Sequence, residues 1–307
     1  MLKGKDILNT AQFSIEELSL IMDTAADYEQ KVKNFEVIKD MEGRVVACLF
    51  FEPSTRTRLS FESAANRVGA RVISVSSAGS SSTAKGETLV DTIRTVDGYI
   101  DVIVMRHPEI GSARIAADNA RHPVINAGDG SGQHPTQALL DIYTIRKEKG
   151  SLEGHTVTFL GDLKYGRTVH SLGYFMTMYK NKMIFVSPES LRMPEELTAD
   201  FRNRGAEIEE TDNVSEALSR SDIVYVTRIQ RERFDNPEEY EKLKGSYIID
   251  RNTINKAKKG ITVLHPLPRV DEISTDLDDY EGAAYFRQAH NGIFVRMALL
   301  ALVSGVR

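Results

Sequence analysis

The chain has 307 residues, of which 41% are hydrophobic and 27% are charged, with a formal net charge of −5; this composition is typical of a globular protein with room for two ordinary domains. The negative balance argues against general affinity for nucleic acid, which needs a basic face, and no apolar run has the length that a membrane span or a signal peptide requires. The single cysteine, Cys48, excludes a disulfide framework and a thiolate metal site, and it fits a cytoplasmic location.

The first half of the chain alternates helical and strand patterns. Ser14 and Glu17 have capping-box spacing at the start of the first helix, and Gly69 is placed to end the second. The predicted elements are a helix over 14–33, a strand over 44–51, a helix over 57–68, a strand over 71–75, a helix from 87, a strand over 102–105, a helix over 111–121, a strand over 123–127 and a helix over 136–148.

The most informative stretch is Ser54-Thr55-Arg56-Thr57-Arg58, between the strand over 44–51 and the helix that follows it. At such a helix N-terminus, free backbone N–H groups and the helix dipole attract anions. Capping explains one hydroxyl, but not three hydroxyls together with two arginines. The stretch therefore predicts an oxyanion site, and the absence of a following Gly-Lys-Ser/Thr excludes a nucleotide P-loop.

Further polar residues follow other predicted strands. Arg106 and His134 each lie just beyond a strand end, where the ligands of parallel α/β sheets bind. Residues 79–86, Gly-Ser-Ser-Ser-Thr-Ala-Lys-Gly, are too small and polar to pack in a core. The simplest interpretation, without any functional role, is a surface loop. They also precede a helix, so Lys85 lies beside another helix N-terminus.

A second alternation begins after Gly154, with predicted strands over 156–160, 183–186, 223–226, 247–250 and 261–264 and a closing apolar helix near 285–304. The charged run over 227–237 is predicted to be a loop. Alternating strands and helices indicate parallel sheets with right-handed crossovers. The predicted fold class is α/β, with two doubly wound parallel-sheet domains, helices on both faces and an active site in the cleft between them. The helix over 134–149 is the predicted hinge.

Several motifs together resemble one family. Ser54-Thr55-Arg56-Thr57-Arg58 resembles the carbamoyl-phosphate signature of the transcarbamoylases, and His134-Pro135-Thr136-Gln137 resembles their second signature. The late motif from His265 to Ile273 and the triplet Arg228-Ile229-Gln230 resemble the aspartate-specific members, because the ornithine-specific ones carry a cysteine where this chain has Pro266. The resemblance covers the whole chain.

The resemblance implies that the amine of L-aspartate attacks the carbonyl carbon of carbamoyl phosphate, which gives N-carbamoyl-L-aspartate and phosphate, the first committed step toward pyrimidines. It implies no cofactor and no metal. It assigns carbamoyl phosphate to residues 1–133, with the helix over 285–307 packing back on them, and aspartate to residues 134–284. By motif match, the residues expected to bind carbamoyl phosphate are Ser54, Thr55, Arg56, Thr57, Ser81, Arg106, His134 and Gln137.

Within that set, Arg106 is expected to bridge phosphate and carbonyl, while His134 and Thr55 donate to the carbonyl oxygen. The residue type of His134 invites a general base, but neighbouring arginines favour a neutral imidazole that donates a hydrogen bond. The departing phosphate then takes the proton of the amine. Arg56, Thr55, Lys85, Arg106 and His134 are the expected catalytic residues.

The two carboxylates of aspartate suit arginine forks. Family positions assign them to Arg167 with Thr168 and to Arg228 with Gln230, with Lys85 nearby, while Leu267 and Pro268 present a backbone carbonyl to the substrate. Glu52 is either solvent-exposed or pairs across the cleft with Arg167 and Arg233 in a closed form.

The family also implies a homotrimer in which the serine-rich loop reaches into the site of the neighbouring subunit. Lys85 and one of the serines at 80–82, here assigned as Ser81, are then donated in trans. Whether separate regulatory chains bind is left open. So is a different second substrate. A binding protein without catalysis is the alternative class, but the intact set of His134, Arg106, Lys85 and Arg228 argues against it. A dinucleotide-binding oxidoreductase is excluded because Gly161-Asp162-Leu163 lacks the Gly-x-Gly-x-x-Gly turn.

Overall fold

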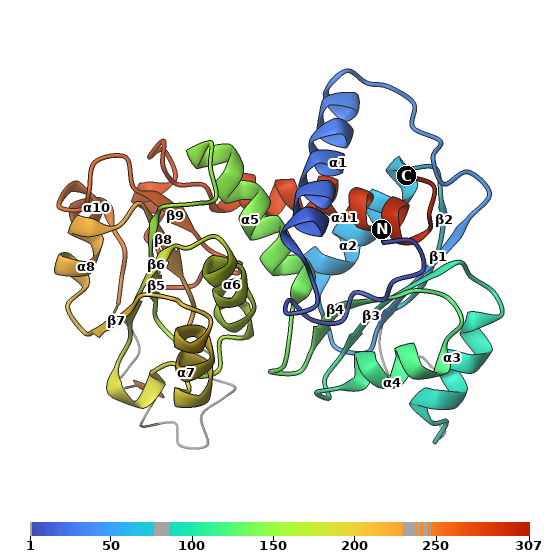
Figure 1. Cartoon of the computed structure of the whole chain (residues 1–307), viewed down its shortest axis with the longest axis horizontal. Helices are drawn as coiled ribbons and strands as arrows, with labels where there is room; N and C mark the ends of the chain where they lie inside the picture. Colours follow the sequence, from blue (N-terminus) through green and yellow to red (C-terminus); the bar gives the residue numbers. More distant parts are fainter. Residues whose placement is uncertain (1, 77–85, 230–237, 239, 242–244, 246) are drawn as a thin grey trace. The chain divides into compact units, whose positions relative to one another are not determined.

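The computed structural model describes residues 2–76, 86–229, 238, 240–241, 245 and 247–307. The chain divides into two compact units, Met1–Leu140 with His290–Arg307, and Asp141–Ala289. The chain passes from one unit to the other inside helix α5 (Pro135–Lys149) and again inside helix α11 (Tyr285–Val303). Each unit contains a parallel sheet (Figure 1).

The first unit holds a four-stranded sheet in the order β2-β1-β3-β4, with every neighbouring pair parallel. Apolar residues of the strands pack on α3 and α4 on one face, while α1 and α2 lie on the other (Figure 1). This confirms the predicted fold class for this half. The elements are α1 (Ile15–Lys33), β1 (Val45–Phe50), α2 (Thr55–Arg67), β2 (Arg71–Val75), α3 (Leu89–Asp97), β3 (Val102–His107), α4 (Ser112–Asn119) and β4 (Val124–Asp129).

The second unit holds a five-stranded parallel sheet in the order β7-β6-β5-β8-β9. Helices α8 and α10 pack on one face, and α6 covers the other (Figure 1). The fold-class prediction is confirmed here too. The elements are β5 (Thr156–Leu160), α6 (Arg167–Met178), β6 (Lys182–Val186), η3 (Glu189–Leu191), α7 (Glu195–Asn203), β7 (Ile208–Thr211), α8 (Val214–Arg220), β8 (Ile223–Val226), α10 (Arg251–Asn255), β9 (Thr262–Leu264) and η5 (Thr275–Leu277).

Local sequence signals account for the helix ends. Ser14 and Glu17 form the predicted capping box of α1. Gly69 follows the C-cap of α2 with φ +86°, a conformation that glycine adopts without a steric cost. These two predictions are confirmed.

The predicted strand over 247–250 is wrong. Only Ile249 makes a parallel bridge there, with Ile273, and it lies outside the sheet. The side chain of Asp250 accepts a hydrogen bond from the Thr253 N–H at 2.7 Å and caps α10, so the chain turns into a helix where the apolar pattern predicted extended backbone.

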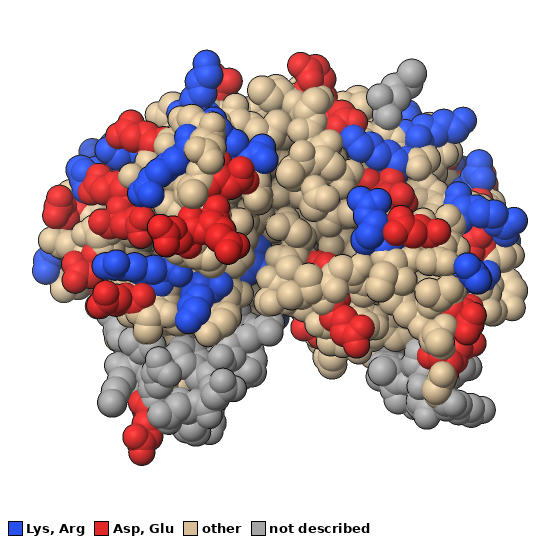
Figure 2. All heavy atoms as spheres, turned by 60° about the horizontal axis from the view of Figure 1, so that its bottom comes forward, with Lys and Arg blue, Asp and Glu red and all other residues tan. Residues whose placement is uncertain are grey.

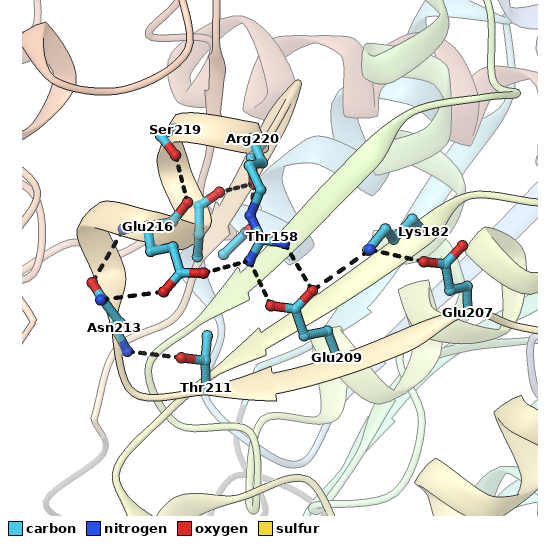
Figure 3. Close-up of polar contacts among 11 residues, drawn as sticks. Thr158, Lys182, Glu207, Glu209, Thr211, Asn213, Glu216, Ser219 and Arg220 are labelled. Atoms are coloured by element: carbon cyan, nitrogen blue, oxygen red, sulfur yellow. Dashed lines mark hydrogen bonds and ion pairs between the residues drawn. The ribbon is translucent and has the colours of Figure 1, made fainter.

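Strand β7 at the sheet edge was not predicted, because its sequence, Ile208-Glu209-Glu210-Thr211, lacks a strand's apolar alternation. Figure 3 shows how its charge is compensated: Arg220 of α8 and Lys182 of β6 both point to Glu209. Such charges also discourage pairing of an exposed edge with another chain. On the face drawn in Figure 2, acidic and basic side chains are interspersed in the same way.

Asp97 at the end of α3 is a buried carboxylate that fixes the connection into β4. It accepts hydrogen bonds from the N–H and Nε of Arg121 and from the N–H of His122, and His122 Nδ1 lies 2.9 Å from its Oδ1. Burial raises the pKa of Asp97, but these hydrogen bonds outweigh burial and lower it to about 2.

The Asp97→Asn variant should therefore lose about 2 kcal/mol of stability at pH 7. Because the folded-state pKa lies below the unfolded value of about 3.8, this contribution is complete above pH 4–5 and disappears as the pH falls toward 2. Thermal unfolding midpoints at pH 7 and pH 3 measure the difference. Asp118→Asn, at an exposed position in α4, serves as the control, and an equal deficit at both pH values would contradict the assignment.

Candidate functional site

The predicted oxyanion stretch lies where β1 leads into α2. Ser54 is the N-cap residue of α2, and its side chain makes no capping hydrogen bond. Thr55, Arg56 and Thr57 form the first turn; Thr55 and Arg56 are exposed and Thr57 is buried. The N–H groups of a first helical turn have no partner within the helix. A helix N-terminus with this hydroxyl beside it suits an anion.

Arg106 lies beside this turn. It is the second-last residue of β3, opposite Phe50 in the register, and its carbonyl accepts the N–H of Phe51 at 2.9 Å. The residue is only 8% exposed, with Nη2 3.2 Å from Glu52 Oε1 and Nη1 3.4 Å from the carbonyl oxygen of Ala127. Burial lowers the pKa of Arg106, although Glu52 opposes this effect. The order β2-β1-β3 makes the gap between β1 and β3 the topological switch point, where such sheets bind ligands.

His134 and Gln137 flank the start of α5 and are both buried. The turn before them is shaped by Asp129, whose carboxylate accepts hydrogen bonds from the N–H groups of Gln133 and Gly111, both at 2.9 Å. The Thr136 hydroxyl lies 3.5 Å from His134 Nδ1. This unit thus gathers Glu52, the α2 turn and Arg106 at one switch point, and it places His134 and Gln137 after the neighbouring strand β4.

The corresponding edge of the second unit carries Arg167 and Arg228. Arg167 opens α6 after β5, with Thr168 next to it, and Arg228 follows β8. The order β6-β5-β8 makes the gap between β5 and β8 the switch point of this sheet.

Gly161 explains how closely the chain segments after β5 and β8 approach each other. It has φ +115°, and a Cβ there would lie 2.4 Å from the carbonyl oxygen of Thr227. The Thr227 hydroxyl is 3.2 Å from the carbonyl oxygens of both Leu160 and Asp162. These contacts hold the backbones that carry Arg167 and Arg228 together.

A pocket opens at the same edge of the second unit. Its lining includes Gly161, Thr227, Arg228, Tyr247 and Glu272, so it joins the end of β8 to the chain after β9. The described lining thus combines the guanidinium of Arg228 and backbone groups with the carboxylates of Asp271 and Glu272, around a cavity large enough to admit a small molecule.

The chain after β9 turns sharply at Leu267, which has φ +56°, and the Leu267–Pro268 peptide bond is cis. The N–H of Leu267 donates to His265 Nδ1 at 2.8 Å, and His265 Nε2 lies 2.7 Å from Glu272 Oε1. Burial raises the pKa of Glu272, but the contact with His265 and the N–H of Val270 lower it to below its usual range. Leu267 thus has a backbone conformation that its neighbours fix.

Four predicted site residues lie outside the described residues: Ser81, Lys85, Gln230 and Arg233. The other predicted residues fall into the two groups above, one in each unit. The proposed pairing of Glu52 with Arg167 and Arg233 stays a prediction.

Sequence reasoning assigned no role to five buried polar residues near Leu267. Two of them, His265 and Glu272, belong to the late motif, and the other three are Asp141, Tyr225 and Gln288. Asp141 interrupts the apolar run Ala138-Leu139-Leu140 of α5, which is a signal for a buried, bonded carboxylate. Within the described ranges, no three His, Cys, Asp or Glu side chains are grouped so that they could hold a metal ion. None of the helices described there is long and apolar enough to cross a membrane.

Comparisons with known proteins agree with this geometry. A family profile described as aspartate/ornithine carbamoyltransferase, carbamoyl-P binding domain, matches residues 5–147, and its Asp/Orn binding domain counterpart matches residues 153–303. A relative from Thermococcus gammatolerans, named aspartate carbamoyltransferase catalytic subunit, is 52% identical over 99% of this chain and 98% of its own length.

Solved structures give the same result. The aspartate transcarbamoylase of Trypanosoma cruzi in complex with N-(phosphonacetyl)-L-aspartic acid has a TM-score of 0.93 and 42% identity, covering 98% of this chain and 96% of that one. The catalytic subunit of Methanocaldococcus jannaschii aspartate transcarbamoylase has a TM-score of 0.91 and 48% identity, covering 97% of each chain. At these identities and coverages, the likeness extends beyond the fold.

Proposed function

Since the chain belongs to the aspartate/ornithine carbamoyltransferase family, we propose that it transfers the carbamoyl group of carbamoyl phosphate to the amine of L-aspartate. The products are N-carbamoyl-L-aspartate and phosphate, and the reaction leads toward pyrimidines. The observation that carries the proposal is the pair of polar groups at the two switch points, one built on a helix N-terminus with a buried arginine, the other on two arginines beside a pocket. The first suits a phosphate and the second a dicarboxylate.

The first group binds carbamoyl phosphate. Ser54, Thr55, Arg56 and Thr57 surround the phosphate, which has two negative charges to compensate. Arg106 reaches both the phosphate and the carbonyl oxygen, where its buried guanidinium stabilises the charge that develops in the tetrahedral intermediate. Gln137 fixes the carbamoyl amide.

His134 donates to the carbonyl oxygen as a neutral imidazole. This role requires the proton to be on Nε2, so that Nδ1, which lies 3.5 Å from the Thr136 hydroxyl, is the acceptor nitrogen of the ring. The amine of aspartate loses its proton to the departing phosphate. No carboxylate is required as a base.

The second group binds aspartate. Arg167 with Thr168 holds one carboxylate, Arg228 with Gln230 holds the other, and the carbonyl of Leu267 accepts from the amine, with Pro268 completing the turn. The assignment agrees with the motif after β9, which has Pro266 where the ornithine-specific relatives carry a cysteine.

A homotrimer with shared sites is part of the proposal. Strand β2 is at the edge of its sheet, Ile73 on it is 42% exposed, and Leu59 on the neighbouring α2 is 52% exposed. Exposed apolar residues beside an unpaired edge suit contact with a second copy of the chain. In the sequence, Ser81 and Lys85 come after this edge strand, and the proposal assigns them to the site of the neighbouring subunit.

An assay of carbamoyl-aspartate formation from labelled carbamoyl phosphate tests the function directly. Product that depends on both substrates is the expected result. Binding of carbamoyl phosphate without product would instead identify a binding protein, and product with a different amino acid would keep the family but reject the second substrate.

The Arg228→Ala variant should raise the KM for aspartate by on the order of tenfold to a hundredfold and lower kcat, because one carboxylate loses its charged fork. The affinity for carbamoyl phosphate, measured by calorimetry, should change less than about twofold. Arg202→Ala, which removes a surface arginine of the same unit, is the matched control. Equal losses for both substrates would contradict the division of roles.

A further inference from the structure

His265, directly after β9, has a polar neighbour at each ring nitrogen. Nδ1 lies 2.8 Å from the backbone nitrogen of Leu267, and a backbone N–H can only donate, so Nδ1 carries no proton. The proton of the neutral ring is therefore on Nε2, which lies 2.7 Å from Glu272 Oε1. Glu272 also accepts from the N–H groups of Val270 and Asp271, and its lowered pKa keeps it an ionised acceptor. The surroundings thus select one tautomer of His265.

The backbone of His265 is fixed from the other side. Its N–H donates to Gln288 Oε1 at 2.8 Å, and Gln288 Nε2 donates to Asp141 Oδ1 at 2.6 Å. The second oxygen of Asp141 accepts from the Tyr225 hydroxyl at 2.9 Å. These side chains are at most 2% exposed and come from α11, α5 and β8. A buried hydrogen-bonded network of this kind rigidifies the backbone it holds.

Leu267 is the residue that this network holds in place. Its φ of +56° lies in the left-handed region, which a leucine adopts only at a cost in free energy. The hydrogen bond from its N–H to His265 Nδ1 stabilises this conformation and so sets the direction of the neighbouring peptide groups.

We propose that His265 is a positioning residue: its Nδ1 holds the Leu267 peptide so that the Leu267 carbonyl meets the amine of the second substrate. The proposal rests on the proposed function, since it needs aspartate as that substrate. His265 itself does not touch the reacting atoms; it acts through Leu267.

Two variants separate the two ring nitrogens. In His265→Asn, the amide oxygen occupies the position of Nδ1 and can accept from the Leu267 N–H, whereas His265→Gln reaches the position of Nε2 and offers nothing at Nδ1. His265→Gln should raise the KM for aspartate about tenfold, the effect of one lost hydrogen bond. His265→Asn should stay within about threefold of the unchanged chain.

Inhibition by succinate, which is aspartate without the amine, distinguishes positioning of the Leu267 carbonyl from a merely structural role of His265. In His265→Gln its inhibition constant should change less than about twofold, while the KM for aspartate rises. Equal weakening of succinate and aspartate would overturn the proposal and assign His265 to stability alone. Equal KM values for the two variants would overturn it as well. His155→Gln, at a partly exposed histidine of the same unit, is the control.

A second measurement tests the tautomer of His265 directly and does not depend on the activity of any variant. Nitrogen-15 NMR of the whole chain, with the His265 signal assigned by its loss in His265→Asn, should show a neutral ring protonated on Nε2. A proton on Nδ1 would reject the proposal. If the unchanged chain forms no carbamoyl-aspartate, the proposed function fails, whereas an active chain with an Nδ1–H ring rejects only the role of His265.

Discussion

Replacing Arg106 with alanine should lower kcat by about 10²–10³, the loss typical for removing one donor to a developing oxyanion. The expected loss lies at the upper end because Arg106 also balances Glu52, whose Oε1 lies 3.2 Å from Nη2. Without the guanidinium, the carboxylate of Glu52 would face the phosphate dianion as a like charge. Steady-state kinetics with both substrates, together with calorimetry of carbamoyl phosphate binding, would measure the effect.

Two further variants isolate the cause. Arg106→Lys keeps a positive charge but not the planar fork, so it should recover only part of the lost rate. Arg106→Ala combined with Glu52→Gln should bind carbamoyl phosphate better than Arg106→Ala alone, because the repelling carboxylate is gone. Arg114→Ala, an exposed arginine on α4 of the same unit, should leave kcat unchanged. A kcat for Arg106→Ala within about threefold of the unchanged chain would rule out contact between this arginine and the reacting carbonyl.

The sequence predicted most of the fold because its strands are continuous apolar runs between turn signals, as in buried parallel sheets. It failed where tertiary contacts decide. Strand β7 contains two glutamates in four residues, and Glu209 is compensated by Lys182 and Arg220 from other elements. The strand predicted at 247–250 is the opposite case, an apolar sequence that does not join the sheet. Its last residue, Asp250, caps a helix instead.

Some features of the candidate site likewise follow from local sequence, and others depend on tertiary contacts. Ser54 to Thr57 are consecutive, so their meeting at one helix N-terminus follows from local structure alone. The contact of Arg106 with Glu52 and the bond between Gln288 and Asp141, which are 147 residues apart, depend on strand order and helix packing. No periodicity in a single sequence carries that information.

The position of the boundary between the two units could not be predicted from the sequence either. Before His134 no change in composition marks a border, and the helix over 135–149 is one continuous pattern. The compact units divide within that helix, between Leu140 and Asp141. Which substrate belongs to which half remains a proposal that the Arg106 and Arg228 variants test separately.

Mixing a Lys85→Ala chain with an Arg56→Ala chain should restore activity that neither has alone. If each site of a trimer uses Arg56 of one subunit and Lys85 of its neighbour, random assembly of equal amounts leaves about a quarter of the sites with both native residues. Because each variant alone should lose about 10²-fold or more, the mixture should be at least about 25-fold more active than either variant alone. Activity after dissociation and reassembly measures it.

The matched control is a mixture of Arg56→Ala with Arg106→Ala chains. The proposal places both arginines in the same subunit's share of a site, so every site in this mixture lacks one of them and no activity should return. Recovery in the control would mean that one arginine is donated by a neighbour. No recovery with Lys85→Ala, after mass spectrometry has shown mixed trimers, would mean that Lys85 serves its own subunit. The two mixtures together therefore decide which residues cross the subunit boundary, because only residues from different chains can complement each other.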